Sequence, residues 1–212
     1  VFLALQLVGR IVNLRKKPPV TLGLMAAMTA IHLKPEILFL GVGGDTISRV
    51  CLKPDVIVDS FLSGTIDLKR IIFSAFVHGS DMHLYYNMAS LLLKGVSLEL
   101  SVGPMSFAGT VLFTLVVSHG LVVAVSWALL TFLSVSEPYY SCAVGFSAVL
   151  FGLKYILSRR SPEDSVRIMG IAFQARYTAW VELVLISCLV PNASFLGHLC
   201  GILAGVLHEH AL

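Results

Sequence analysis

Long apolar blocks alternate with short charged clusters along most of the chain. Blocks of this kind predict helices that cross a bilayer. We expect six spans, at about 20–40, 82–100, 103–134, 145–158, 177–190 and 194–208. Lys34 and Pro35 indicate that the first span is bent, or already interfacial, at its end. The polar stretch 41–70 predicts a structured loop, and Gly79-Ser80-Asp81 predicts a turn between a short interfacial helix and the second span.

Composition supports this membrane interpretation. Of the 212 residues, 57% are hydrophobic and 13% are charged, whereas about a quarter of the residues of a soluble domain are charged. We therefore expect an all-α membrane protein, with a basic cytoplasmic leader at 1–19 and one polytopic domain at 20–212. The net charge of +3 is too small to indicate a nucleic-acid partner. Because the chain starts at Val1 rather than methionine, we expect a trimmed or partial sequence.

The four cysteines carry little information about function. They are Cys51, Cys142, Cys188 and Cys200. Their spacing matches no metal-binding pattern, and it does not indicate a redox compartment.

Basic residues predict the orientation of the spans. The arginine-rich stretch 159–176 and the basic leader are expected on the cytoplasmic side, which places both termini there. Residues 100–136 contain no Asp, Glu, Lys or Arg, so they form either one long tilted helix or two short ones. We favour one helix, because it brings the polar residues of the other spans to the same side of the membrane.

The fourth apolar block is too short to cross a bilayer alone. Its roughly 14 residues give about 21 Å of helix, against a hydrocarbon core of about 30 Å. Either the block is not a span, or it begins inside the membrane, shielded by other helices or beside a water-filled cavity. Ser147 lies at that beginning.

Polar residues in the second and sixth spans have two interpretations. His83 and Asn87 are four residues apart and share one helical face, where they form either an interhelical hydrogen bond or a functional site. His198 adjoins a ridge of glycines spaced by four residues, namely Gly197, Gly201 and Gly205. A single histidine in such a place is more often structural than catalytic.

Two further histidine groups indicate no chemistry. We interpret His119 as a packing or cavity-lining residue of the third span. The C-terminal His208-Glu209-His210 lacks the i,i+4 histidine pair of a zinc-binding helix, so we expect a solvated helix end rather than a metal site.

Topology brings the remaining polar residues together. Spans two, four and six all begin on the non-cytoplasmic side, with His83/Asn87, Ser147 and His198 near their beginnings. A histidine can take the proton of a serine nucleophile and later protonate the leaving amine. No acidic residue lies near this depth in these spans, which favours a Ser–His dyad over a triad. The sequence Gly-Phe-Ser-Ala-Val also lacks the second glycine of the soluble-hydrolase elbow.

Four stretches resemble the rhomboid family of intramembrane serine proteases. "HGSDMHLYYNMASLLLKG" is similar to the family's H-x(4)-H-x(3)-N segment, at His78, His83 and Asn87. "GFSAVLFG" resembles its G-x-S motif, and "GHLCGILAG" its histidine helix. In "KRIIFSAFVH", Arg70 takes the family's arginine position, but Lys69 stands where tryptophan is common. "SCAVGFSAVLFGLK" and "NMASLLLKG" are most similar to the endoplasmic-reticulum subfamily.

The resemblance implies a role for each matched residue. Ser147 would be the nucleophile and His198 the base and acid, with His83 and Asn87 as oxyanion donors. Supporting positions are Gly145, which allows a tight turn, together with His78, Gly201 and Gly205. Phe151 stands where many bacterial members have a tyrosine that stacks on the catalytic histidine, so it would stack without offering a hydroxyl.

The resemblance also implies a bundle of six transmembrane helices with a short central fourth helix. Such an enzyme cleaves transmembrane protein substrates within the lipid bilayer near the outer ends of their helices, and it needs no metal or cofactor. We expect an endoplasmic-reticulum or other endomembrane location. The main alternative is a catalytically silent rhomboid-like scaffold that binds membrane clients for degradation or trafficking. A small-solute transporter would show inverted repeats, and none is visible in the sequence.

Overall fold

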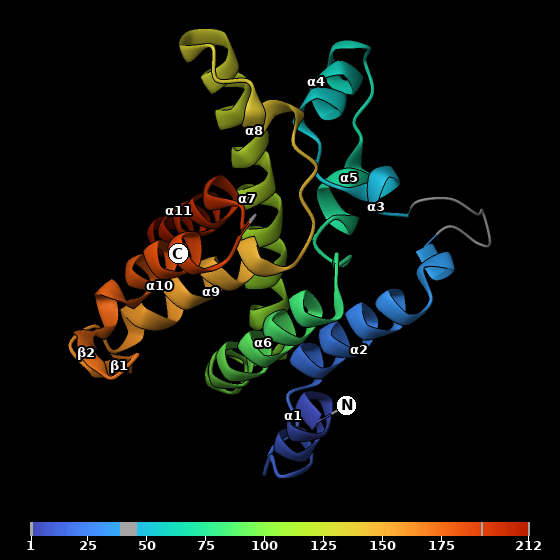
Figure 1. Ribbon diagram of the computed structural model, residues 1–212. Coiled ribbons are helices and arrows are strands. Elements are labelled where there is room, and N and C mark those ends of the chain that lie inside the picture. Colours follow the sequence, from blue (N-terminus) through green and yellow to red (C-terminus); the bar gives the residue numbers. More distant parts are fainter. Residues whose placement is uncertain (1, 39–45, 192, 212) are drawn as a thin grey trace.

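The computed structural model describes residues 2–38, 46–191 and 193–211, and within them the fold is mostly helical. Its longer helices are α1 (Phe2–Val12), α2 (Pro19–Leu33), α6 (Asp81–Val102), α7 (Pro104–Leu133), α9 (Ser147–Arg160), α10 (Thr178–Leu189) and α11 (Phe195–Ala211). Shorter helices are α3 (Thr46–Val50), α4 (Pro54–Leu62), α5 (Leu68–Phe73) and α8 (Glu137–Tyr140). Two short 3₁₀ helices are η1 (Pro35–Leu38) and η2 (Ala175–Tyr177). Figure 1 shows α9 lying among α6, α7, α10 and α11.

Residues 104–133 form one continuous helix, so the two-helix alternative for this stretch is wrong. Pro104 occupies the first turn, where its missing N–H costs no helical hydrogen bond. Within the described ranges, α7 is the one helix that is both long and apolar enough to cross a membrane by itself. The six-span count therefore stays a prediction.

The first apolar block is shorter in the structure than the pattern indicated. Helix α2 ends at Leu33 rather than near residue 40, because Pro35 disfavours a helical Lys34 and the chain continues as the 3₁₀ turn η1. Residues 39 and 40 of the predicted span lie outside the described ranges. The leader carries a helix of its own, α1, whose Leu7 and Ile11 pack against the main core.

The prediction of an all-α protein is wrong in one segment, which forms two β-strands. Strands β1 (Ser165–Ile168) and β2 (Ile171–Gln174) pair antiparallel inside the arginine-rich stretch. Met169 and Gly170 connect them with φ angles of 51° and 84°. Two positive φ angles in a two-residue loop are the signature of the turn that matches strand twist. β-Branched residues on both sides of this turn then favour pairing over helix.

Helix α9 is the centre of the packing. It contacts α6, α7, α10 and α11. Phe146, Val149, Leu150, Leu153 and Ile156 bury one side of it in the main apolar core, which also includes residues of α2, α6 and α7. A central helix that neighbours enclose on several sides can begin away from water, as the shielded alternative for this block requires.

A buried carboxylate joins α2 to α6. Glu99 is 2% exposed, and its oxygens accept hydrogen bonds from the backbone N–H groups of Val20 and Thr21 and from the Thr21 hydroxyl at 2.7–2.9 Å. The first N–H groups of a helix have no partner within the helix and carry partial positive charge. Glu99 therefore caps α2 from a neighbouring helix.

A disulfide fixes the loop region to the chain segment that precedes α9. Cys51, after α3, is bonded to Cys142, and the two Cα atoms are 5.3 Å apart. Next to it, Leu52 and Ala143 exchange both of their backbone hydrogen bonds, at 2.8 and 3.0 Å. Residues 41–45 of the polar loop predicted at 41–70 lie outside the described ranges. From residue 46 on, the loop holds short helices, and it contacts the approach to Ser147.

Candidate functional site

Ser147 is the first residue of α9. Gly145, two residues earlier, has a φ of 115° and donates its N–H to the Ser74 carbonyl at 2.8 Å. A side chain at Gly145 would be strained by this φ, and its Cβ would lie 2.6 Å from Nε2 of His83. Glycine therefore allows the His83 ring to lie against the turn that leads into Ser147.

His198 lies opposite Ser147 in the first turn of α11. The Ser147 Oγ atom is 3.0 Å from His198 Nε2, which is hydrogen-bond distance. The Phe151 ring stacks on the His198 ring, with centroids 4.4 Å apart and planes 28° apart. His198 is buried, and its Nδ1 atom has no hydrogen-bond partner among the described residues. Ser147 and His198 thus form a pair in which no carboxylate contacts the imidazole.

Close packing of α11 on α9 sets the distance between this pair. A Cβ at Gly201 would lie 2.1 Å from the Ala148 carbonyl oxygen, and a Cβ at Gly205 would lie 2.8 Å from that of Gly152. The glycine ridge predicted from the sequence therefore lies directly on α9. Because the contact involves backbone, no side-chain rotation can make room for an added methyl group.

His83 and Asn87 extend the same site from α6. Ser80 caps this helix by accepting the His83 N–H at 3.2 Å. The Asn87 amide nitrogen donates to the His83 carbonyl at 2.8 Å, while its Oδ1 has no partner among the described residues. One Asn87 N–H therefore stays available for a ligand. The structure brings His83 beside Gly145, and it places Asn87 one turn further along α6.

His78 lies behind His83, outside the long helices. Its buried ring meets the His83 ring edge to face, with centroids 5.0 Å apart. Burial, and after it the positive charge that His83 and His32 can carry, lowers the pKa of His78 to about 3. His78 is therefore neutral at physiological pH, and its ring packs edge to face against the His83 ring.

A charged cluster lies elsewhere on α9, and sequence reasoning missed it. Lys154 of α9 and Lys94 of α6 both bond to the carboxylate of Glu182 on α10. Lys154 was visible as a charge within a predicted span, but no local spacing identified its partner 28 residues away. The disulfide was also missed, because 91 residues separate its cysteines.

The other predicted histidines have structural positions. His119 is buried on α7 and hydrogen-bonds through Nδ1 to the Ile71 carbonyl at 2.7 Å, so it packs rather than lining a cavity. His208 is not solvated as predicted: it is buried and bonds to the Thr110 hydroxyl at 3.0 Å, because α11 lies along α7. The chain as described contains no group of three or more His, Cys, Asp or Glu residues that could hold a metal ion.

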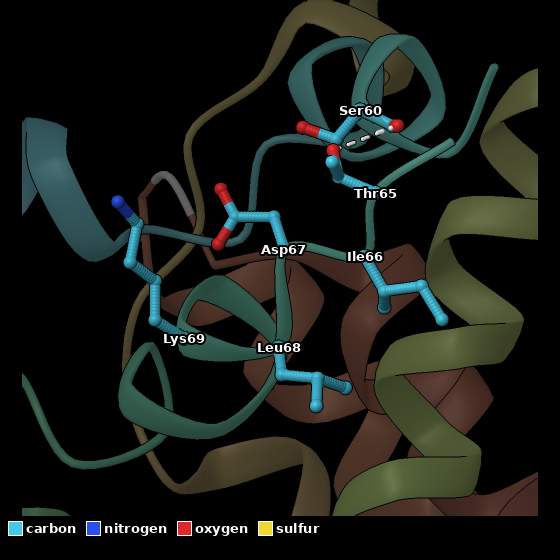
Figure 2. Close-up of a pocket in the computed structure, with 6 residues that line it drawn as sticks. All are labelled: Ser60, Thr65, Ile66, Asp67, Leu68 and Lys69. Carbon is cyan, nitrogen blue, oxygen red and sulfur yellow. Dashed lines mark hydrogen bonds between the residues drawn. The ribbon is translucent and has the colours of Figure 1, made fainter. Parts of the chain in front are cut away.

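A shallow pocket of about 370 Å³ lies away from the pair, between α4 and α5. Figure 2 shows its six lining residues, Ser60, Thr65, Ile66, Asp67, Leu68 and Lys69. Thr65 donates to the Ser60 carbonyl at 3.0 Å, and Asp67 accepts the N–H of Arg70 at 3.3 Å at the start of α5. These bonds close a turn, and the pocket contains none of the residues that meet at Ser147.

Comparisons with known proteins place this geometry in a family. Residues 66–211 match a model described as "Rhomboid domain". The chain is 42% identical over 207 residues to "Rhomboid-like protein 14, mitochondrial" of Arabidopsis thaliana, covering 97% of this chain and 60% of that protein. It is 34% identical over 197 residues to human "Rhomboid-related protein 4", covering 93% of this chain and 58% of that protein.

A more distant relative carries a protease name. "Rhomboid-type serine protease 2" of Eremothecium gossypii is 27% identical over 152 residues, covering 72% of this chain and 56% of that protein. The chain thus spans about 60% or less of the length of these relatives. A domain match over well over half of the chain, together with close relatives across nearly all of it, shows that the chain belongs to the rhomboid family of integral membrane proteins.

Proposed function

We propose that this chain is an intramembrane serine endopeptidase that cleaves the transmembrane helices of membrane-protein substrates. The observation that carries the proposal is the 3.0 Å distance between Ser147 Oγ and His198 Nε2. A serine hydroxyl is a poor nucleophile until a neighbouring base accepts its proton. The protease name of one relative supports the same activity.

The reaction proceeds through an acyl-enzyme. As Ser147 Oγ attacks the scissile carbonyl carbon, its proton passes to His198 Nε2. The resulting imidazolium protonates the leaving amine, the peptide C–N bond breaks, and the acyl group remains as an ester on Ser147. Water then gives a proton to His198 and attacks the ester, and the serine recovers its proton as the acid leaves. Phe151 stacks on the imidazole and holds its plane through these transfers.

We assign three donors to the developing oxyanion. They are the His83 ring, the unused N–H of the Asn87 amide and the backbone N–H of Ser147 at the start of α9. The first N–H groups of a helix have no intrahelical partner, and the helix dipole favours negative charge there. Donors that are fixed in place before the reaction stabilise the oxyanion more than water molecules do, because they need not reorient as the charge develops.

We further propose that six helices cross or enter the membrane, namely α2, α6, α7, α9, α10 and α11. The Ser147 end of α9 faces the non-cytoplasmic side, and both termini are cytoplasmic. Two features support this orientation. Disulfides such as Cys51–Cys142, which lies near the Ser147 end, persist in oxidising compartments. Four arginines lie at 159–176, beyond the other end of α9, and basic loops stay cytoplasmic.

The organelle has two candidates. Sequence stretches around Ser147 and Asn87 are most similar to the endoplasmic-reticulum subfamily, whereas one relative has "mitochondrial" in its name. Both the lumen of the endoplasmic reticulum and the mitochondrial intermembrane space permit disulfides, so the cysteines fit either. We propose the endoplasmic reticulum, and co-fractionation of the tagged full-length protein with mitochondrial markers would contradict this.

Proteolysis in reconstituted vesicles tests the proposed activity. The native chain should release a product from a co-reconstituted single-span protein whose helix is weakened by glycine near its outer end, because an intact helix hides its carbonyls in hydrogen bonds. Ser147→Ala should abolish cleavage. Ser158→Ala is the matched control, because that hydroxyl on the same helix donates to the Tyr155 carbonyl of its own helix and to no other group among the described residues.

The same assay separates the enzyme from the alternative. If Ser147→Ala cleaves as fast as the native chain, the protease proposal is wrong. If neither cleaves but both retain the substrate in co-purification, the catalytically silent scaffold is the better account.

A further inference from the structure

The β1–β2 hairpin has two chemically different faces. Residues directly opposite each other in an antiparallel pair share a face, and successive residues alternate. The pairs Val166–Phe173 and Ile168–Ile171 therefore form one face that is entirely apolar. The pairs Ser165–Gln174 and Arg167–Ala172 form the other, polar face. Such a two-stranded element has no independent stability in water unless its apolar face is covered.

Much of that apolar face is uncovered in the folded chain. Val166 is 37% exposed and Ile171 is 62% exposed, while Met169 at the tip is 75% exposed. Ile168 and Phe173 are only half-buried. The described part of the chain thus leaves the apolar face of the hairpin largely exposed. A partner other than this part of the chain is needed to cover it.

The surroundings of the hairpin are basic. Residues 159–176 contain four arginines, Arg159, Arg160, Arg167 and Arg176, against two acidic residues, Glu163 and Asp164, which leaves a net charge of +2. Glu163 is already paired with Arg176 at 2.6 Å. The arginines at 159 and 160 end α9 and are exposed. The partner that covers the apolar face should therefore carry negative charge close to these arginines.

Aromatic residues of the kind found at bilayer surfaces lie close to the hairpin. Tyr177 is the N-cap residue of α10, Trp180 lies in the first turn of that helix, and both side chains are exposed. Tyr and Trp concentrate where hydrocarbon meets water. The Arg176 guanidinium lies over the Tyr177 ring, 5.5 Å from its centroid. Because only two residues separate Tyr177 from β2, the hairpin lies next to these aromatic side chains, at the far end of α9 from Ser147 (Figure 1).

We propose that the β1–β2 hairpin is an interfacial anchor whose apolar face enters the surface of the bilayer while the exposed arginines that end α9, Arg159 and Arg160, contact anionic lipid headgroups. The lipid is the favoured occupant because three independent features of its chemistry are matched: hydrocarbon by the apolar face, the interface by the aromatic pair and anionic phosphate by the arginines. This anchor rests on the membrane location of the family and not on the proposed proteolysis.

Adjacent residues on opposite faces provide the test. Spin labels are attached at Ile171→Cys or Ala172→Cys in the full chain, with Cys188→Ser and Cys200→Ala to remove the free thiols and the disulfide retained. Both labelled positions are exposed, so labelling does not disturb the core. In vesicles of phosphatidylcholine and phosphatidylglycerol, the label at 171 should collide several-fold more with oxygen than with a water-soluble nickel chelate, and the label at 172 should show the reverse. Equal access of the nickel chelate to both labels would overturn the proposal and leave a soluble protein as the occupant.

The arginines have a separate measurement. Adding phosphatidylglycerol to phosphatidylcholine vesicles should reduce nickel access to the label at 171 in the otherwise native chain. Replacing both Arg159 and Arg160 with glutamine should weaken this dependence, whereas Lys53→Gln, which removes a charge at the start of α4, should not. An unchanged dependence in the variant that lacks Arg159 and Arg160 would contradict the role given to these arginines.

Discussion

Substituting Gly201 with alanine would place a methyl group where the Ala148 carbonyl already lies. The added Cβ would be 2.1 Å from that oxygen, and it would also lie 2.8 Å from the carbonyl carbon. Relief to ordinary van der Waals distance requires α11 to move away from α9 by about 1 Å or more. His198 lies one turn earlier on the same helix. Its Nε2 would then move from 3.0 Å to roughly 4 Å from Ser147 Oγ, which is beyond hydrogen-bond distance.

This substitution should slow the reaction of Ser147 and also destabilise the fold, by similar free energies. A misplacement of about 1 Å can cost about 100-fold in rate, and overpacking a core costs about 1–3 kcal/mol. The assay is the rate of fluorophosphonate labelling, with thermal unfolding measured in parallel. Gly120→Ala is the matched control, because an added Cβ at that position on α7 meets nothing within 4 Å. If Gly201→Ala reacts at the native rate, the dyad does not depend on this helix contact and the reasoning is refuted.

Three further predictions concern stability and pH. Reducing the Cys51–Cys142 disulfide, or replacing Cys142 with serine, should lower the free energy of unfolding by about 4–5 kcal/mol on the loop-entropy estimate, since 91 residues separate the cysteines; an unfolding temperature unaffected by reductant would contradict this. Glu99→Ala should cost about 1–3 kcal/mol for each N–H group of α2 that loses its acceptor, while Glu99→Gln should recover part of the loss; equal melting of both variants would argue against the cap. Because the pKa of His78 is about 3 when folded and 6.5 when unfolded, stability should fall as pH drops below about 6.5, by about 2 kcal/mol at about pH 5. His78→Gln should flatten this part of the curve, and an identical slope would contradict the burial argument.

Helix α7 and the position of Ser147 were predictable because hydropathy and charge act over the whole length of a span. Residues 100–136 contain no Asp, Glu, Lys or Arg, so they could form one helix or two. Only a single helix places the beginnings of the spans that carry His83, Ser147 and His198 on the same side of the membrane. The structure has that one helix and the resulting approach of Ser147 to His198. Topology carried more information here than any local motif.

The missed features depend on contacts between distant parts of the chain. Cys51 and Cys142 pair because the Leu52–Ala143 bridge aligns their segments, and neither cysteine has a local spacing signal. Glu99 looks like an ordinary interfacial charge at the end of the second span, but it caps α2. The capping role is visible only once α2 and α6 are packed together.

The hairpin was missed because its turn is unusual. Asn-Gly or Asp-Gly would have signalled a tight hairpin, but Met169 occupies the first left-handed position, with a φ of 51°. The four arginines in the same stretch indicated a cytoplasmic loop and gave no sign of a strand. The alternation of Val166, Ile168, Ile171 and Phe173 was the available signal.

Fluorophosphonate labelling of the purified chain, followed by peptide mass spectrometry, tests the Ser147–His198 dyad most directly. The account predicts a single phosphonylated residue, Ser147, with labelling lost in Ser147→Ala and strongly reduced in His198→Ala, while both variants melt close to the native temperature. Labelling of folded His198→Ala at the native rate, or an adduct on another serine with Ser147 unmodified, would contradict the central claim.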